Sequence, residues 1–506
     1  MSAGSVAHQQ VVPDRRRRVL ILLICSMSLL IVGLDSTIVN VALPAIQRSF
    51  HSSLSGLQWT VDAYTLVLAS LLLLSGSTAD RLGRRRVFQV GLAVFSLGSL
   101  LCAVAPSLGL LIAFRVLQAI GGAMLTPVGM SIVRNVFVDP SERAQAIGIW
   151  GAVFGISMAL GPVLGGFLVS AISWRAIFLV NVPFGLAAIA LTALFVPESR
   201  APRPRRFDPA GEVLVLTALA TLTYAIIEGG RVGFGTAWIV ILLAFSLACF
   251  AALVLYELRR REPLLEVRFF TSVPFAGAST IAVCLFAATG GFLFLTTLYL
   301  QDVRGLSPLH AGLAMLPMAA MMIVFAPLSG RLVARFGARP SMVAGGLAVM
   351  VSGLLLTGLA RGTPILLLLG AYAVFGVGSG LVNPPITNTA VSGMPPAQAG
   401  VAAAVATTSR QVGLTLGVAV LGAVAGAGLG NAIGPGFASA TQPGWWIVAI
   451  LGLVVTVLGY LTTTAWARET ARRTAERFEE PALRDLEPRE PAVGAPGRAV
   501  GARLAE

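Results

Sequence analysis

Long apolar stretches alternate with short polar segments along most of the chain. Apolar runs of about 18 residues or more are long enough to cross a membrane as helices. The pattern predicts fourteen such helices, and an even number puts both termini on one side of the membrane. The expected ranges are 19–40, 57–78, 87–106, 109–133, 144–170, 175–196, 211–229, 236–256, 273–298, 308–330, 340–360, 364–387, 400–426 and 444–466.

One of these runs is interrupted by small residues and a proline. Gly155, Gly161, Pro162, Gly165 and Gly166 fall within twelve positions of the fifth run. In a membrane helix, small residues allow neighbouring helices to approach closely, and those neighbours can satisfy the backbone groups that a proline leaves unpaired. We therefore expect this stretch to form a tightly packed seam.

The arginines are distributed unevenly between the loops. Loops that face the cytoplasm carry an excess of basic residues, so the arginine-rich loops and both termini are expected in the cytoplasm. This distribution also explains the net charge of +14 without a nucleic-acid partner. The arginine-rich loops hold Arg81, Arg84, Arg85, Arg86, Arg134, Arg143, Arg200, Arg203, Arg205, Arg206, Arg259, Arg260, Arg261, Arg268, Arg331, Arg335 and Arg339, and the opposite loops hold Arg48, Arg175, Arg231, Arg304 and Arg361.

The composition argues against a soluble enzyme. Of the 506 residues, 56% are hydrophobic and 11% are charged, so the chain is expected to be an all-α polytopic membrane protein. We find no P-loop, no HExxH motif, no nucleophile elbow in an α/β context, and no metal-ligand spacing around the four cysteines. The sequence therefore predicts a protein that is not an enzyme and that holds no metal or cofactor.

The chain contains an internal repeat. Gly76-x4-Arg81-x-Gly83-x-Arg85 follows the second run and returns as Gly330-x4-Arg335-x-Gly337-x-Arg339 after the tenth. Two homologous six-helix halves are a transporter architecture in which substrate binds between the halves near the midplane. The expected organisation is a cytoplasmic tail (1–18), an N-terminal half (19–196), two inserted helices with flanking loops (197–272), a C-terminal half (273–466) and a cytoplasmic, disordered tail (467–506).

An ordered set of motifs then identifies a family. They are Leu34-Asp35-Ser36-Thr37 in the first run, Asp80-Arg81-Leu82-Gly83-Arg84-Arg85 after the second, Arg115-x-x-Gln118-x-x-Gly121 in the fourth, the Gly155–Gly166 stretch in the fifth, and Trp174-Arg175 followed by Asn181-Val182-Pro183. Together these resemble the fourteen-span drug:proton antiporters of the major facilitator superfamily over residues 18–466.

The resemblance implies roles for several of these residues. It links Arg115 to proton coupling and the Gly161-Pro162 stretch to export. It also implies a conformational latch that holds the halves together when the outside is open, with Asp80 meeting a helix N-terminus and an arginine such as Arg134. The matching latch residues are Asp80, Arg81, Gly83, Arg84, Arg85 and Arg134.

Two carboxylates inside the predicted helices are candidates for proton coupling. A charged side chain at the centre of a membrane helix costs on the order of 2.5–3.5 kcal/mol. Because such residues usually face a cavity and carry protons or ions, Asp35 is expected to take part in proton coupling. The alternative is an Asp near the outer end that a neighbouring helix satisfies. Asp62 is the second candidate, with a solvated helix end as its alternative. Arg115 is expected to pair with a carboxylate or polar groups on another helix, either for proton coupling or only to fix packing.

Further residues are candidates for a substrate cavity. Aromatic, amide and cationic side chains inside a membrane bundle can line such a cavity, although ordinary interhelical packing is the alternative for each aromatic group. We expect Arg410 to contact an anionic substrate group or a carboxylate. The candidates are Asn40, Gln118, Trp150, Phe154, Phe286, Phe292 and Arg410.

These features predict a proton-coupled antiporter of the plasma membrane. It would export lipophilic drugs, antibiotics or related metabolites by alternating access, as a monomer, with the proton gradient as its energy source. An uptake symporter or facilitator for a small organic solute on the same fold is the alternative, because fold alone does not fix direction.

Overall fold

A computed structural model describes residues 14–201, 208–260, 263, 265–392, 394, 398–427 and 436–484. These ranges contain fourteen helical segments that are long and apolar enough to cross a membrane, which confirms the predicted number. The N-terminal half consists of α1 (Arg15–Phe50), α2 (Leu54–Leu82), α3 (Arg84–Ala103), α4 (Leu108–Val136), α5 (Pro140–Ala171), α6 (Ala176–Leu179) and α7 (Asn181–Phe195).

The C-terminal half repeats this arrangement after an inserted pair of helices, α8 (Pro209–Val232) and α9 (Ala237–Arg259). Its elements are η1 (Val267–Thr271), α10 (Val273–Leu298), the π-helical η2 (Tyr299–Val303), α11 (Pro308–Ala314), α12 (Leu316–Phe336), α13 (Ala338–Leu356), α14 (Ile365–Val391), α15 (Ala399–Ala427), α16 (Phe437–Ala440) and α17 (Gln442–Leu461), followed by α18 (Ala465–Arg484).

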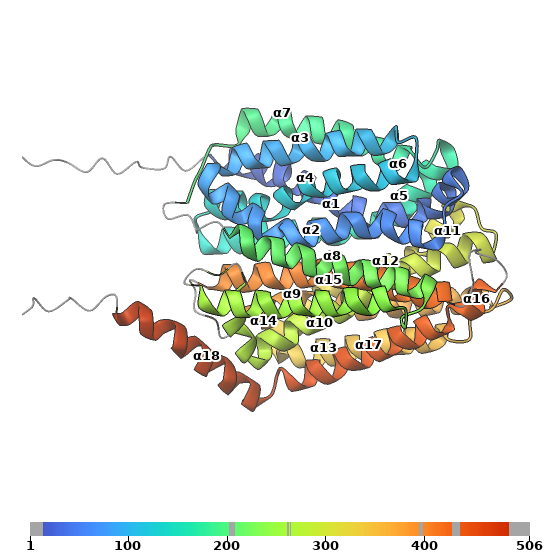
Figure 1. The fold of residues 1–506 in the computed structure, drawn as a ribbon. Helices are drawn as coiled ribbons and strands as arrows, with labels where there is room; N and C mark the ends of the chain where they lie inside the picture. The colour runs from blue at the N-terminus through green and yellow to red at the C-terminus, as the bar shows by residue number, and fades with distance from the viewer. Residues whose placement is uncertain are drawn as a thin grey trace, which may run out of the picture.

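The two halves lie side by side, with α8 at their junction (Figure 1). Helix α8 packs against both α2 and α15, whereas α9 packs chiefly on α8. Helix α18 lies at one end of the bundle, and α6, α11 and α16 lie at the opposite end (Figure 1). We refer to the end that carries α18 as the inner end and to the opposite end as the outer end.

Several helices extend beyond the apolar runs that predicted them. Helix α1 continues ten residues past the expected end at position 40, through Pro44, to Phe50. It ends where His51 adopts a left-handed conformation with φ of 49°. Ile46 is fully buried, so packing against the neighbouring helices keeps this polar-flanked segment helical.

The expected tail at residues 467–506 begins as a helix. Helix α18 presents Ala467, Ala471 and Thr474 to the bundle and is anchored by Phe478, whose ring lies 5.2 Å from that of Phe269. The tail was predicted to be disordered beyond a short helical extension of the last span, and it is helical as far as Arg484 because these contacts bury one face of the helix. The part of that prediction beyond Arg484 lies outside the described residues, as do residues 1–13 of the tail expected at 1–18, whereas residues 15–18 form the start of α1.

Candidate functional site

A buried polar cluster surrounds Asp35 in the N-terminal half. The Arg115 guanidinium on α4 donates from Nη1 to Asp35 Oδ2 at 2.5 Å. Oδ1 of Asp35 accepts from Gln118 Nε2 at 2.8 Å and from Asn181 Nδ2 at 3.0 Å. Both members of the ion pair are almost inaccessible, with 1% of the Arg115 side chain and 0% of the Asp35 side chain exposed.

Three further helices hold this ion pair between α1 and α4 in place. Arg115 and Gln118 are three residues apart on α4 and therefore share one face of that helix. Arg115 Nη1 also donates to Gln118 Oε1 at 2.7 Å, and Gln118 Nε2 donates to Ser99 Oγ on α3 at 2.7 Å. Arg115 Nε reaches the Thr60 carbonyl on α2 at 3.2 Å. Asn181 is the first residue of α7, so α1, α2, α3, α4 and α7 all meet at this cluster.

An aromatic ring completes the surroundings of the cation. The Cζ atom of Arg115 lies 4.1 Å from the centroid of the Tyr64 ring on α2. A guanidinium close to an aromatic face gains cation–π stabilisation, which is largest where water is excluded. A buried ion pair is favourable only when its remaining hydrogen-bonding groups are satisfied, and this one has that support on both sides.

The cluster settles the environment of three candidates. Asp35 lies 15 residues before the end of α1, so it is not at a helix end, but side chains of α4 and α7 do satisfy it, as the alternative reading expected. Arg115 pairs with a carboxylate on another helix, as the sequence predicted. Gln118, a cavity candidate, belongs instead to the hydrogen bonds around Asp35 in this conformation. The sequence reasoning did not single out Asn181, Ser99 or Tyr64, although Asn181 stands in one of the quoted motifs.

Asp62 occupies a different environment. It is fully buried near the outer end of α2, so the solvated helix end is excluded. Neither of its carboxyl oxygens has a hydrogen-bond partner in the described part of the chain. Gln58 and Thr65 lie four residues before and three after it, on the same face, and both contact α15 across the boundary between the halves. Asp62 is thus an uncompensated carboxyl group at the interface of the two halves.

Contacts at the outer end hold the halves together. Gln301 Nε2 donates to the Val41 carbonyl at 2.9 Å, and the Leu309 amide donates to Ser170 Oγ at 3.0 Å. Arg48 and Asp302 are 3.8 Å apart, and Gln58 Nε2 donates to the carbonyls of Val418 and Ala419. The structure is therefore closed at its outer end.

The glycine-rich stretch of α5 contributes to this closure. A Cβ on Gly161 or Gly165 would collide with Thr37 or Ile38 on α1, two to three residues after Asp35. A Cβ on Gly166 would instead meet the Pro308 carbonyl and Leu309 of the other half. On the other half, a Cβ on Gly312 would in turn collide with the Pro162 carbonyl of α5. The predicted seam is present from Gly161 to Gly166, whereas Gly155 has no neighbour within 4 Å of such a Cβ.

The predicted latch residues lie at the inner end. Asp80 Oδ1 accepts from Arg84 at 2.9 Å, and Arg85 donates from its amide to Glu198 and from its side chain to the Ala193 carbonyl. Gly83 has a φ of 114° and packs against the Glu198 carboxylate, where a side chain would not fit. The chain from α2 to α3 is therefore tied to the segment after α7, and Glu198 was missed by sequence reasoning.

Arg81 and Arg134 occupy exposed positions at the ends of α2 and α4. The ion pair of Asp80 in the described part of the chain is with Arg84 and not with Arg134. Arg134 instead points toward the start of α15, 3.5 Å from the place of a Cβ on Gly400. The latch was expected when the outside is open, and the present structure is closed there.

The remaining cavity candidates differ in how deeply they are buried. Phe292 is fully buried and stacks on Phe375 at 4.2 Å, so it packs in the core of the C-terminal half. Asn40 is also buried and donates to the Thr37 carbonyl. Trp150 is half-buried and Phe286 is 4% exposed. The side chain of Phe154 lies outside the described part of the structure.

Arg410 is half-buried where α10, α14 and α15 converge. Its Nη2 donates to Thr387 Oγ1 at 2.6 Å, and its Cζ lies 5.9 Å from the Phe286 ring centroid.

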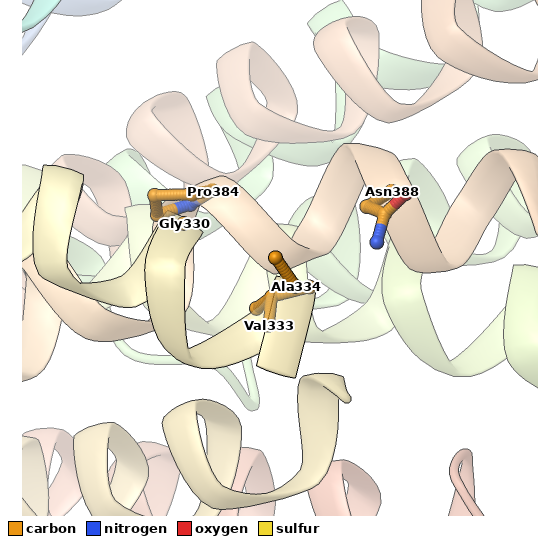
Figure 2. Close-up of a pocket in the computed structure, with 5 residues that line it drawn as sticks. All are labelled: Gly330, Val333, Ala334, Pro384 and Asn388. Carbon is orange, nitrogen blue, oxygen red and sulfur yellow. The ribbon is translucent and has the colours of Figure 1, made fainter. Parts of the chain in front are cut away.

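A cavity of about 300 Å³ lies between α12 and α14 near the inner end. Figure 2 shows its lining residues Gly330, Val333, Ala334, Pro384 and Asn388. Ala334 stands where the first copy of the repeat has Asp80. A Cβ on Gly330 would find no atom within 4 Å, whereas the matching Gly76 packs against Pro127. The two halves therefore differ at this position, as the replacement of Asp80 by Ala334 in the second copy of the repeat predicts.

Comparisons with known proteins agree with this architecture. The sequence model described as Major Facilitator Superfamily matches residues 25–418. The chain is 38% identical to the "Multidrug resistance protein Stp" of Mycobacterium tuberculosis, over 83% of this chain and 78% of that protein. It is 36% identical to the "Tetracenomycin C resistance and export protein" of Streptomyces glaucescens, over 87% and 82% of the two chains.

Solved structures show the same fold at low identity. A bacterial homologue of the human lysosomal transporter Spinster superposes with a TM-score of 0.64 at 19% identity, over 91% of this chain and 99% of that one. A D-xylose-proton symporter superposes with a TM-score of 0.63 at 15% identity, over 87% and 97%.

Proposed function

Because the chain belongs to the major facilitator superfamily, we propose that it is a proton-coupled antiporter that exports lipophilic drugs or related metabolites. Export is supported by the names of relatives, which refer to multidrug resistance, tetracenomycin C resistance and export, and methylenomycin A resistance. Substrate would load from the cytoplasmic side and leave on the other side by alternating access, with both termini in the cytoplasm.

The observation that carries proton coupling is the buried, unpartnered carboxyl group of Asp62. No cation lies within 4.0 Å of it in the described part of the chain, and its hydrogen-bonding capacity is unused. Burying an isolated carboxylate is far more costly than burying a protonated carboxyl group. The outer end can therefore close over Asp62 when that group carries a proton.

This requirement links the proton to the transport cycle. With the outer end open, Asp62 would be hydrated and could take a proton from outside. Protonation would then permit closure, which Gln58 and Thr65 complete through their bonds to α15. Asp35, whose charge is compensated by Arg115, would fix the position of α1 relative to α4. A movement of one of these helices would then be passed on to the other.

The test compares Asp62→Asn with the wild type in everted membrane vesicles. Ethidium and anthracene-9-carboxylate serve as fluorescent probes, with and without an imposed pH gradient. We expect the wild type to accumulate at least one probe when the vesicle interior is acidic and to reverse when the gradient is reversed. Asp62→Asn should retain probe exchange without a gradient but should lose the acceleration by protons.

The uptake alternative gives a different result, because probe and proton would then move in the same direction. Asp35→Asn is a poor single test, since it leaves Arg115 buried without its counter-ion, which costs about 3–5 kcal/mol. The double variant Asp35→Asn/Arg115→Gln removes both charges of the buried pair and therefore avoids that penalty. It is the variant in which a role of the Asp35–Arg115 pair should be tested, beside Asp62→Asn. Undiminished proton acceleration in Asp62→Asn would exclude Asp62 as the coupling group.

A further inference from the structure

We propose that Arg410 binds an anionic group of the substrate, so that the transported compounds are lipophilic organic acids that carry a carboxylate or an ionised phenol. This inference rests on the proposed export function and names the substrate class for it.

The hydrogen-bonding capacity of Arg410 is largely unused. A guanidinium carries five N–H donors in a rigid planar fork. The hydrogen bond from Nη2 to Thr387 Oγ1 is its single side-chain bond in the described part of the chain. Its Nε is buried and has no partner there. The remaining donors are arranged for a planar anion, because guanidinium and carboxylate pair in a bidentate fashion.

No carboxylate of its own half can neutralise Arg410. Residues 273–461 contain one acidic residue, Asp302, which lies at the outer end and pairs with Arg48. Arg115, the buried arginine of the other half, does have close partners, because its guanidinium lies 2.5 Å from Asp35 and 2.7 Å from Gln118. Among the described residues, one membrane-embedded arginine thus has a carboxylate partner and the other has none.

Asp62 is the carboxyl group on the facing helix, but it lies at a different depth. Gln58 and Thr65 contact α15 at Val418 and Thr415, so Asp62 faces the segment between them. Arg410 precedes that segment by more than one helical turn, on the inner side. Arg410 donates to Thr387 and neither carboxyl oxygen of Asp62 has a partner, so these two residues form no ion pair in the described part of the chain. Glu212 on α8, which also packs against α15, has no hydrogen-bond partner among the described residues, and the charge that acts on it is that of Asp208 and not that of Arg410. An anion from outside the chain would supply the acidic partner that Arg410 does not have among the described residues.

The location suits a transported ligand. Arg410 lies eleven residues after Ala399, which is about 16 Å along the axis at 1.5 Å per residue and near the middle of a bilayer core. Transporters of this architecture bind substrate between their halves at that depth. The apolar cavity between α12 and α14 is lined on the α14 side by Pro384 and Asn388 (Figure 2), and Thr387 lies between these two residues in the sequence.

The experiment measures binding to the purified full-length protein in lipid nanodiscs. The probes are anthracene-9-carboxylate, its uncharged methyl ester and the cation ethidium, each followed by fluorescence. We expect the wild type to bind the acid at least tenfold more tightly than the ester. Arg410→Gln should weaken binding of the acid by roughly 10- to 100-fold, the range for a charge-assisted hydrogen bond, and should leave binding of the ester within about twofold.

Two further variants make the result specific. Arg410→Lys keeps the charge but not the planar fork, so it should retain part of the affinity for the acid. Arg361→Gln removes an exposed arginine of an outer loop and should bind all three probes like the wild type. Binding of the ester by Arg410→Gln also shows that this variant is folded.

Defined outcomes overturn the inference. Equal affinity of the wild type for acid and ester would do so, as would unchanged acid binding in Arg410→Gln. Restoration of acid binding by Asp62→Asn in the Arg410→Gln background would identify Arg410 as the partner of Asp62 instead. Proton-driven efflux of ethidium that does not depend on Arg410 would leave the proposed function standing, whereas acid binding without proton-driven efflux would overturn that function and support the anion site.

Discussion

Asn181 and Gln118 share one oxygen of Asp35, so each supplies a hydrogen bond to a charge that water cannot reach. Asn181→Ala should lower stability by about 1.5–3 kcal/mol, the contribution of a hydrogen bond to a charged group. Thermal unfolding of the detergent-solubilised protein, followed by tryptophan fluorescence, measures this loss. Asn40→Ala is the matched control, because Asn40 is equally buried but donates only to a backbone carbonyl at 3.3 Å. Equal losses in the two variants would mean that the cluster does not depend on Asn181.

The sequence could identify the charged members of this cluster but not their partners. A carboxylate or an arginine inside an apolar run is conspicuous because its burial is costly. Ser99, Tyr64 and Asn181 are neutral and occur among many similar residues, so their position depends on how five helices meet. The same packing gives Asp35 an arginine partner and leaves Asp62 without a partner among the described residues. Arg410 is conspicuous in the sequence for its charge, but only the three-dimensional structure shows that no carboxylate pairs with it among the described residues.

At the scale of a single element, α5 packs closely against helices of both halves, through different glycines. Gly161 and Gly165 admit α1 within the N-terminal half, and Gly166 admits α11 from the other half. Gly166→Leu should therefore obstruct closure of the outer end and abolish net efflux of the fluorescent probes, while the N-terminal half remains folded. Gly155→Leu is the control on the same helix and should transport like the wild type, because no atom lies within 4 Å of its Cβ position. Wild-type efflux in Gly166→Leu would remove this contact from the mechanism.

The number and order of the helices were predictable, but several of their ends were not. Hydropathy detects the segment that suits lipid, whereas α1, η2 and α18 continue as helices where protein contacts replace lipid. Helix α18 is amphipathic and polar on average, so its apolar stripe against α10 and η1 does not register as an apolar run. The repeat predicted two similar halves, yet the cavity lined by Gly330 and Ala334 lies where the second copy has an alanine in place of Asp80.

At the scale of the whole molecule, closure of the outer end and protonation of Asp62 should be one event. A disulfide can report closure, because the Leu309 amide and Ser170 Oγ are 3.0 Å apart across the two halves. We consider Ser170→Cys/Leu309→Cys in a background where Cys25, Cys102, Cys249 and Cys284 are replaced by Ala. Oxidation should lock the outer end closed and stop efflux, and reduction should restore it. The single-cysteine variants control for direct effects of the oxidant.

The pH dependence of this cross-link then tests the coupling. Closure over an ionised Asp62 is unfavourable, so rising pH should slow cross-linking of the wild-type interface relative to the same cysteine pair with Asp62→Asn. Thiolate chemistry alone accelerates with pH in both backgrounds, and the ratio of the two rates removes that contribution. A ratio that falls steadily from mildly acidic to mildly alkaline solution is the expected signature. A ratio that does not change would mean that the outer end closes without regard to the proton on Asp62, and that the energy of the gradient enters the cycle at another group.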